Sequence, residues 1–267
     1  MTELVQGLDQ KILLSLAQAA AAILLCFSLV LLCRRFSVHV ERETTLSLLR
    51  GLVQMVAVGV VLSLLLHGGV LTSALILLAM TFAAAFTASR RAPDIDDALL
   101  VAFYAVGAGA SVVIAFMLVT HAITPEVTVL VPVGSMIIAN AMNAAAQAME
   151  RFKSDVTSHV GQIEAGLSLG AEPRATVAPY VQSAVYASLL PRLDMLKSLG
   201  LVWIPGVMAG MLVSGASPVY AGIFQFIVVA MILTASGIAG LVATLLFRTR
   251  AFSKEAQLTL RPGRQES

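Results

Sequence analysis

The sequence has few charged residues. Only 12% of its 267 residues are Asp, Glu, Lys or Arg, whereas 58% are hydrophobic. A water-soluble domain carries about twice that charged fraction, so an ordinary soluble protein is excluded. Apolar stretches of roughly twenty residues separate the charges, which is the length of a helix that crosses a bilayer. These stretches lack the alternating pattern of a transmembrane β-barrel. The composition therefore predicts an all-α polytopic protein that lies in the lipid bilayer. No nucleic-acid partner is expected.

Cysteine is also scarce. Cys26 and Cys33 are the two cysteines, and both lie in the first apolar stretch. Seven residues of helix separate them by about 10 Å. A disulfide between them needs a large distortion, so we expect two free packing residues.

We expect no cleavable signal sequence at the N-terminus. The segment Thr2–Gln10 carries Glu3 and Asp9, and the apolar run Ile12–Cys33 is longer than the core of a typical signal peptide. No small-x-small cleavage site precedes the basic pair that closes this run. We expect a retained membrane anchor.

Nucleotide-binding chemistry is absent as well. A phosphate-binding loop of the form G-x-x-x-x-G-K-[ST] needs a Gly-Lys dipeptide, and the sequence contains none. If ATP drives this protein, a separate chain must hold the ATP and its magnesium, and this chain needs no cofactor.

From Gly51 to Met149, Asp and Glu occur only in loops or at the ends of apolar stretches, and no His cluster appears. An intramembrane enzyme therefore lacks its converging groups, and the metal ligands of any metal site are unknown. The eleven methionines are interpreted as core residues rather than as a soft-metal path.

Seven membrane spans follow from the apolar stretches. They are Ile12–Cys33, Leu46–Leu66, Val70–Ala88, Ala98–Thr120, Val127–Met149, the short Leu199–Ser214 and Val219–Phe247. Three turns, at residues 66–70, 121–126 and 215–218, contain no Lys or Arg, whereas the opposite side holds most basic residues, Arg192 and Lys197 included. Positive residues stay cytoplasmic, so we expect the N-terminus outside and the tail, residues 248–267, inside. With such short turns, residues 1–267 are predicted to form a single transmembrane domain. Because no organelle-targeting segment is visible, we expect it to be multi-pass in a bacterial inner membrane.

The connection between the fifth and sixth spans is predicted to contain an amphipathic helix from Asp155 to Pro173. Its apolar positions, Val160, Ile163, Leu167 and Ala171, recur at helical spacing, and Pro173 ends it. Such a short helix needs a surface on which to bury its apolar stripe. The acidic residues on its other face favour a protein partner, and a position flat on the lipid surface is the alternative.

Residues 164–171, Glu-Ala-Gly-Leu-Ser-Leu-Gly-Ala, resemble the E-A-A-x-x-x-G loop of ABC permeases, with Gly166 where that loop usually has Ala. Residues 131–142, 167–171 and 200–210 resemble the Fet-type permease family, which includes iron-export and plant aluminium-tolerance permeases. The resemblance implies a homodimeric permease that pairs with a cytosolic ABC ATPase subunit, and iron export as the function. It also implies that the loop docks on the ATPase. The residues it assigns to this coupling are Ile163, Glu164, Ala165, Gly166, Leu167, Gly170 and Ala171.

Polar residues within the spans are candidates to line a transport path. Asn140, Asn143 and Gln147 share one face of the fifth span, and Ser135 is a weaker candidate. Amides are costly in hydrocarbon, so this face either lines a path or makes hydrogen bonds between helices.

The sixth predicted span is the other candidate region. Pro205, Gly206, Met208 and Gly210 interrupt it or allow close approach of another helix, which fits either a broken helix beside a cavity or a simple packing face. An ion-coupled secondary transporter or channel remains the alternative function. Such carriers usually contain ionisable residues inside the membrane, and the predicted spans have almost none.

Overall fold

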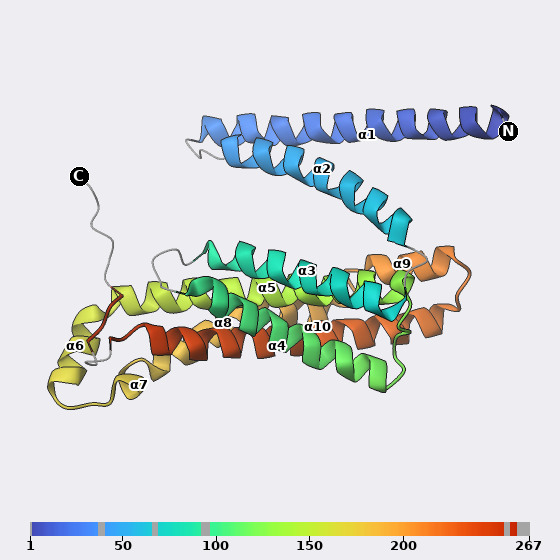
Figure 1. Ribbon diagram of the computed structural model, residues 1–267. Helices are drawn as coiled ribbons and strands as arrows, with labels where there is room; N and C mark the ends of the chain where they lie inside the picture. The colour runs from blue at the N-terminus through green and yellow to red at the C-terminus, as the bar shows by residue number, and fades with distance from the viewer. Residues whose placement is uncertain (1, 37–40, 66–68, 92–96, 254–256, 261–267) are drawn as a thin grey trace. The chain divides into compact units, whose positions relative to one another are not determined.

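The computed structural model describes residues 2–36, 41–65, 69–91, 97–253 and 257–260. In these ranges all the regular elements longer than an isolated β-bridge are α-helices (Figure 1). The contacts divide the chain into two compact units, Met1–Leu66 and His67–Ser267. The single permease domain stays a prediction.

The first unit is a pair of helices, α1 (Thr2–Arg35) and α2 (Glu41–Leu65). An ion pair between Arg34 Nε and Glu41 Oε1, at 3.9 Å, joins the end of one to the start of the other. Most of the described side chains of this unit are exposed, and many of them are large and apolar. Both cysteines are free, as expected. A surface of this kind suits a lipid environment or a protein neighbour.

The second unit is a bundle of long helices with three short ones. The long helices are α3 (Val70–Ser89), α4 (Ala98–Val119), α5 (Val127–Ser158), α8 (Ala178–Ser198) and α10 (Pro218–Arg250). The short ones are α6 (Val160–Ser168), α7 (Pro173–Thr176) and α9 (Gly206–Val213). Helix α5 packs against α3, α4, α8 and α10, so it forms the centre of the bundle.

Small residues allow the long helices to approach closely. A Cβ atom placed on Gly109 of α4 would lie 2.5 Å from the carbonyl oxygen of Ala235 on α10. Alanines fill much of the remaining contact between α4, α5 and α10. Membrane helices use such small residues because close van der Waals packing, rather than the hydrophobic effect, drives their association.

One end of the bundle carries the short helices α6 and α7 and most of the unit's ion pairs. Arg91, after α3, lies 3.2 Å from Glu150 of α5, and Arg250 of α10 pairs with Asp97 before α4. The opposite end carries α9 and the turn between α4 and α5 (Figure 1). The basic residues thus gather mainly at the α6–α7 end.

Five of the seven predicted spans are confirmed as helices long and apolar enough to cross a membrane. They lie in α1, α3, α4, α5 and α10. The second predicted span coincides with α2, but Leu66 and the side chains of residues 61–65 lie outside the described part of the chain. Length and composition alone thus recover most of the bundle.

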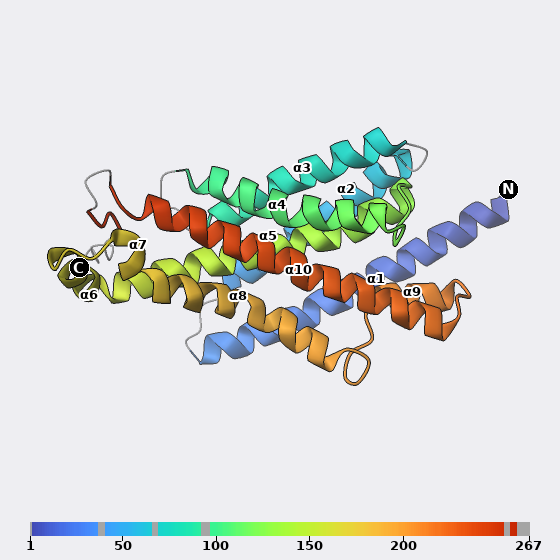
Figure 2. The same ribbon diagram turned by 90° about the horizontal axis from the view of Figure 1, so that it is seen from below.

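The sixth predicted span, Leu199–Ser214, is wrong. Residues 199–205 form turns rather than helix, and α9 has 8 residues, about 12 Å at the rise of an α-helix. Helix α8 instead has 21 residues, about 31 Å, and packs against α5 and α10. It runs from α7 toward the end that carries α9 (Figure 2). The sequence misled because α8 contains Arg192, Asp194 and Lys197, which break its apolar run.

The predicted helix from Asp155 to Pro173 is also corrected. Residues 155–158 belong to α5, and a break at His159, with φ −123° and ψ 25°, separates α5 from α6. Helix α6 ends at Ser168, and Pro173 begins α7 rather than ending α6. A proline fits the first turn of a helix because its missing N–H has no partner there anyway.

Candidate functional site

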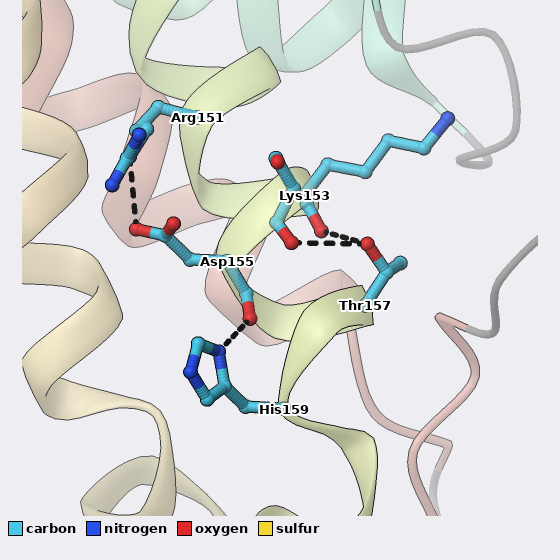
Figure 3. Close-up of polar contacts among 6 residues, drawn as sticks. Arg151, Lys153, Asp155, Thr157 and His159 are labelled. Atoms are coloured by element: carbon cyan, nitrogen blue, oxygen red, sulfur yellow. Dashed lines mark hydrogen bonds and ion pairs between the residues drawn. The ribbon is translucent and has the colours of Figure 1, made fainter.

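The last turn of α5 is held by local polar contacts (Figure 3). Arg151 Nε donates to Asp155 Oδ2 at 3.1 Å, one helical turn away. The ring nitrogen Nδ1 of His159 lies 2.7 Å from the carbonyl oxygen of Asp155 and satisfies that helix-end group. These contacts fix the point at which the chain leaves α5 and enters α6.

Helix α6 buries one face and exposes the other. Ile163 is 1% exposed and belongs to the bundle core, and Val160 and Leu167 pack against that core. Glu164 and Ala165 are exposed on the outer face. The predicted apolar stripe is therefore confirmed at three positions, while the fourth, Ala171, lies beyond the helix and is exposed.

Polar and ring contacts tie α6 to α8. The ring of His159 stacks on Tyr180, with centroids 5.1 Å apart. The hydroxyl of Tyr180 donates to Gln162 Oε1 at 3.4 Å. Because Gln162 lies on α6 and Tyr180 on α8, these contacts connect α6 to the long helix that follows it.

The loop after α6 is shaped by Gly170, which has φ +86°. The N–H of Ala171 donates to Gly166 O at 3.0 Å and the N–H of Gly170 to Leu167 O at 2.9 Å, which is the hydrogen-bond pattern of a Schellman C-cap. This conformation turns Leu169 outward, where it is 89% exposed. A large apolar side chain is therefore exposed just after α6, and the acidic Glu164 is exposed on the same short helix.

Gly166, the departure from the usual E-A-A pattern, has a local reason. A Cβ atom at this position would lie 3.1 Å from Cγ2 of Thr176. The close approach of α6 to α7 therefore favours a residue without a side chain here.

The predicted amide face of α5 is present. Asn143 and Gln147 are exposed in this unit and Asn140 is half-buried. Asn140 Nδ2 donates to Met136 O within α5 at 2.9 Å, and Ser135 Oγ donates to Pro132 O at 2.7 Å. Ser135 therefore satisfies its hydroxyl on its own helix, as is common in membrane helices.

Arg192 is the residue of this site that the sequence reading missed. The sequence predicts it on the cytoplasmic side, but the structure places it against the middle of α5. It is 6% exposed, and its Nη1 and Nη2 donate to Gln147 Oε1 at 3.3 Å and to Asn140 O at 3.2 Å. Once α8 rather than Leu199–Ser214 is taken as the helix of the bundle, Arg192 lies within that helix, six residues before its end at Ser198. That position was the signal available in the sequence.

The second group of predicted path residues lies apart from the amide face, on and before α9. Pro205 is buried, Met208 is half-buried, and Gly206 and Gly210 are exposed, with nothing within 4 Å of a Cβ built on either glycine in the described chain. Gln225 of α10 accepts from the N–H of Met208 at 3.1 Å and so anchors the start of α9. A cavity of about 440 Å³ joins α9 to the first turns of α5 and α10 and to the turn at His121.

A family model supplies the decisive comparison. It is described as an uncharacterised protein family, UPF0014, and it matches residues 16–252. The chain belongs to the UPF0014 family. Its relatives include ALUMINUM SENSITIVE 3 of Arabidopsis thaliana, 29% identical over 91% of this chain and 89% of that protein. The probable iron export permease protein FetB of Escherichia coli is 28% identical over 90% of this chain and 93% of that protein. The UPF0014 membrane protein STAR2 of Oryza sativa is 31% identical over 82% of this chain and 77% of that protein. No solved structure gives a significant match.

The family resemblance inferred from residues 131–210 is thereby confirmed. UPF0014 is a family of membrane proteins, and a relative bears the name of a permease, which is a transport role rather than catalysis. The roles assigned to α6 and to the amide face of this UPF0014 chain stay predictions. In the described residues, no group of three or more His, Cys, Asp or Glu side chains is placed to hold a metal ion.

Proposed function

We propose that this chain is the membrane-spanning permease subunit of an ABC-type transporter, driven by a separate cytosolic ATPase. The observation that carries the proposal is the form of the α6 turn. It exposes Glu164 and Leu169 while Ile163 is locked in the core. The exposed face offers a partner an acidic and an apolar contact, and the buried face transmits the force.

In this proposal α8 is the sixth of seven spans. The N-terminus lies outside, and the α6–α7 end and the tail lie in the cytoplasm of a bacterial cell. The basic residues gathered at the α6–α7 end support that orientation through the positive-inside rule. Two copies of the chain form the core of the transporter. Export of iron is the proposed activity by similarity to FetB, at 28% identity.

Transport follows by alternating access. Closure of the ATPase pair moves α6, and the contacts of Tyr180 with Gln162 and His159 carry that movement into α8. Because α8 holds Arg192 against Asn140 and Gln147, its movement rearranges the amide face of α5. One rigid connection thus links the ATPase contact to the candidate path.

The test uses Leu169→Asp in the full chain, expressed with its native partners. Leu169 is 89% exposed, so the change leaves the fold intact, and we expect loss of a co-purifying ATPase and of its activity. Leu201→Asp is the matched control, because Leu201 is 87% exposed in the turn before α9. An ATPase that stays bound to Leu169→Asp as tightly as to wild type would refute coupling through this turn.

An ion-coupled secondary transporter is the second candidate, and Arg192 is the observation in its favour. Ionisable residues inside the membrane are typical of such carriers, and the corrected α8 provides one. If purified protein alone moves solute along an ion gradient and no ATPase co-purifies, this candidate replaces the first.

A further inference from the structure

Arg192 is a buried charge that has no opposite charge beside it in the described part of the chain. Its guanidinium is bonded to two neutral oxygens, Gln147 Oε1 at 3.3 Å and Asn140 O at 3.2 Å. None of the ion pairs among the described residues includes it. Its Nε is buried and has no acceptor in the described chain. A buried charge of this kind is costly unless something neutralises it.

The predicted membrane spans supply no carboxylate for Arg192. The predicted spans within α1, α2, α3, α4, α5 and α10 contain no Asp or Glu. A second copy has the same sequence, so its matching spans contain none either. The carboxylate nearest in sequence, Asp194, is exposed and pairs with Lys197 at 3.3 Å. No carboxylate of these spans therefore pairs with Arg192, which favours an anion from outside the protein as its partner.

The amide of Gln147, which accepts from Arg192, also carries N–H donors. Gln147 accepts from Arg192 through Oε1, which leaves its Nε2 as a donor on the exposed face. Asn143 is exposed on the same face one turn before it. A guanidinium beside amide N–H groups matches the oxygens of a carboxylate or phosphate, because charge-assisted hydrogen bonds of this type are the strong ones.

We propose that Arg192, Gln147 and Asn143 form an oxyanion-binding site and that the transported species carries negative charge. Its chemical class is a carboxylate or phosphate oxyanion, either free or as the chelate of a metal ion. A bare metal cation meets repulsion from Arg192, whereas an anionic chelate of the same metal is attracted. The proposal rests on the transport function proposed above and names the substrate class of its path.

The test measures binding to the purified full chain in lipid nanodiscs, without any ATPase. The probes are radiolabelled citrate, ferric citrate and ferrous ion, each at equilibrium. Arg192→Gln removes the charge, and we expect it to weaken citrate or ferric citrate binding by about thirtyfold or more. Arg192→Lys keeps the charge and retains most of the binding. Arg174→Gln, at an exposed arginine of α7, is the matched control and leaves binding unchanged.

If Arg192→Gln does not fold, Gln147→Ala serves in its place, because Gln147 is exposed; it is expected to weaken binding severalfold. Citrate binding without iron identifies a free oxyanion, and binding of ferric citrate alone identifies a chelate. The proposal is overturned if neither form binds in an Arg192-dependent manner, or if ferrous ion binds wild type and Arg192→Gln equally well. If no ATPase co-purifies with the wild-type chain, the coupling proposal is refuted and this binding result is unaffected.

Discussion

At the scale of single residues, the buried aromatic pair at the α6–α7 end is the most direct test of the fold. Phe152 and Phe247 are both 0% exposed, and their rings meet edge to face with centroids 5.9 Å apart. They join α5 to α10 close to the start of α6. Truncation of either one leaves a cavity in the contact that supports the α6 turn.

We expect Phe152→Ala to lower the free energy of unfolding by about 3–5 kcal/mol, since it removes a fully buried ring. Phe226→Ala on α10 is the control, because Phe226 is 56% exposed and its loss creates no internal cavity. Unfolding of the purified chain in detergent, followed by circular dichroism, measures the difference. Equal effects of the two variants would contradict the described packing.

Residue identity alone explained some of the site and missed the rest. The amide spacing of Asn140, Asn143 and Gln147 predicted a shared face, because helical periodicity is a local property. Arg192 was not predicted beside them, since its contacts with Gln147 and Asn140 join two helices and span 45 and 52 residues of sequence. A helix containing three charged residues, such as α8, does not stand out in hydropathy, and tertiary packing decides where such a charge lies.

At the scale of elements, two glycines near α6 should respond oppositely to the same substitution. Gly170 has φ +86°, where a side chain is strained, and we expect Gly170→Ala to destabilise the turn by about 1–2 kcal/mol. Gly161 lies in α6 with nothing within 4 Å of an added Cβ, so Gly161→Ala should stabilise the helix by up to about 1 kcal/mol.

Hydrogen exchange of the amides around residues 166–171 is the measurement for this pair. Faster exchange in Gly170→Ala and slower or unchanged exchange in Gly161→Ala support the C-cap geometry. Faster exchange in both variants would show that α6 tolerates no side chain on that face.

The contact between α4 and α10 gives a second prediction at this scale. Gly109→Ala places a Cβ 2.5 Å from the backbone oxygen of Ala235, which forces the helices apart. We expect a loss of about 1–3 kcal/mol, typical of overpacking. Gly107→Ala is the control on the same helix, because its nearest neighbour, Thr81 Cγ2, lies 4.0 Å away. Thermal unfolding of the two variants compares them, and a control that is as unstable as Gly109→Ala would argue against a close α4–α10 contact.

Element boundaries show what local sequence cannot supply. Proline was read as the end of the α6 helix, but a glycine with positive φ ends it, and the proline starts the next helix. The prediction and the structure use the same two residues, Gly170 and Pro173, but assign them different roles. Gly170 ends α6 and Pro173 begins α7. The apolar stripe of α6 was predictable because Val160, Ile163 and Leu167 follow its period.

At the scale of the whole molecule, the long apolar helices were predictable from composition, since each must satisfy its backbone within the bilayer. The path of the chain between α5 and α10 was not. There the polar helix α8 packs in the bundle, whereas the apolar segment around α9 stays short. If α8 is the sixth span, the predicted sides of the loops around it change, whereas the predicted positions of the two termini stay the same.

The sidedness of α8 can be tested with a matched pair of single cysteines. After replacement of Cys26 and Cys33 by Ser, Leu169→Cys presents an exposed thiol between α6 and α7, before α8, and Leu201→Cys presents one just after α8. If α8 crosses the bilayer, a membrane-impermeant maleimide labels Leu201→Cys in intact cells and reaches Leu169→Cys only after permeabilisation. Labelling of both thiols from the same side would place α8 on the membrane surface. It would also remove Arg192 from the depth at which an unpaired charge requires an anionic partner.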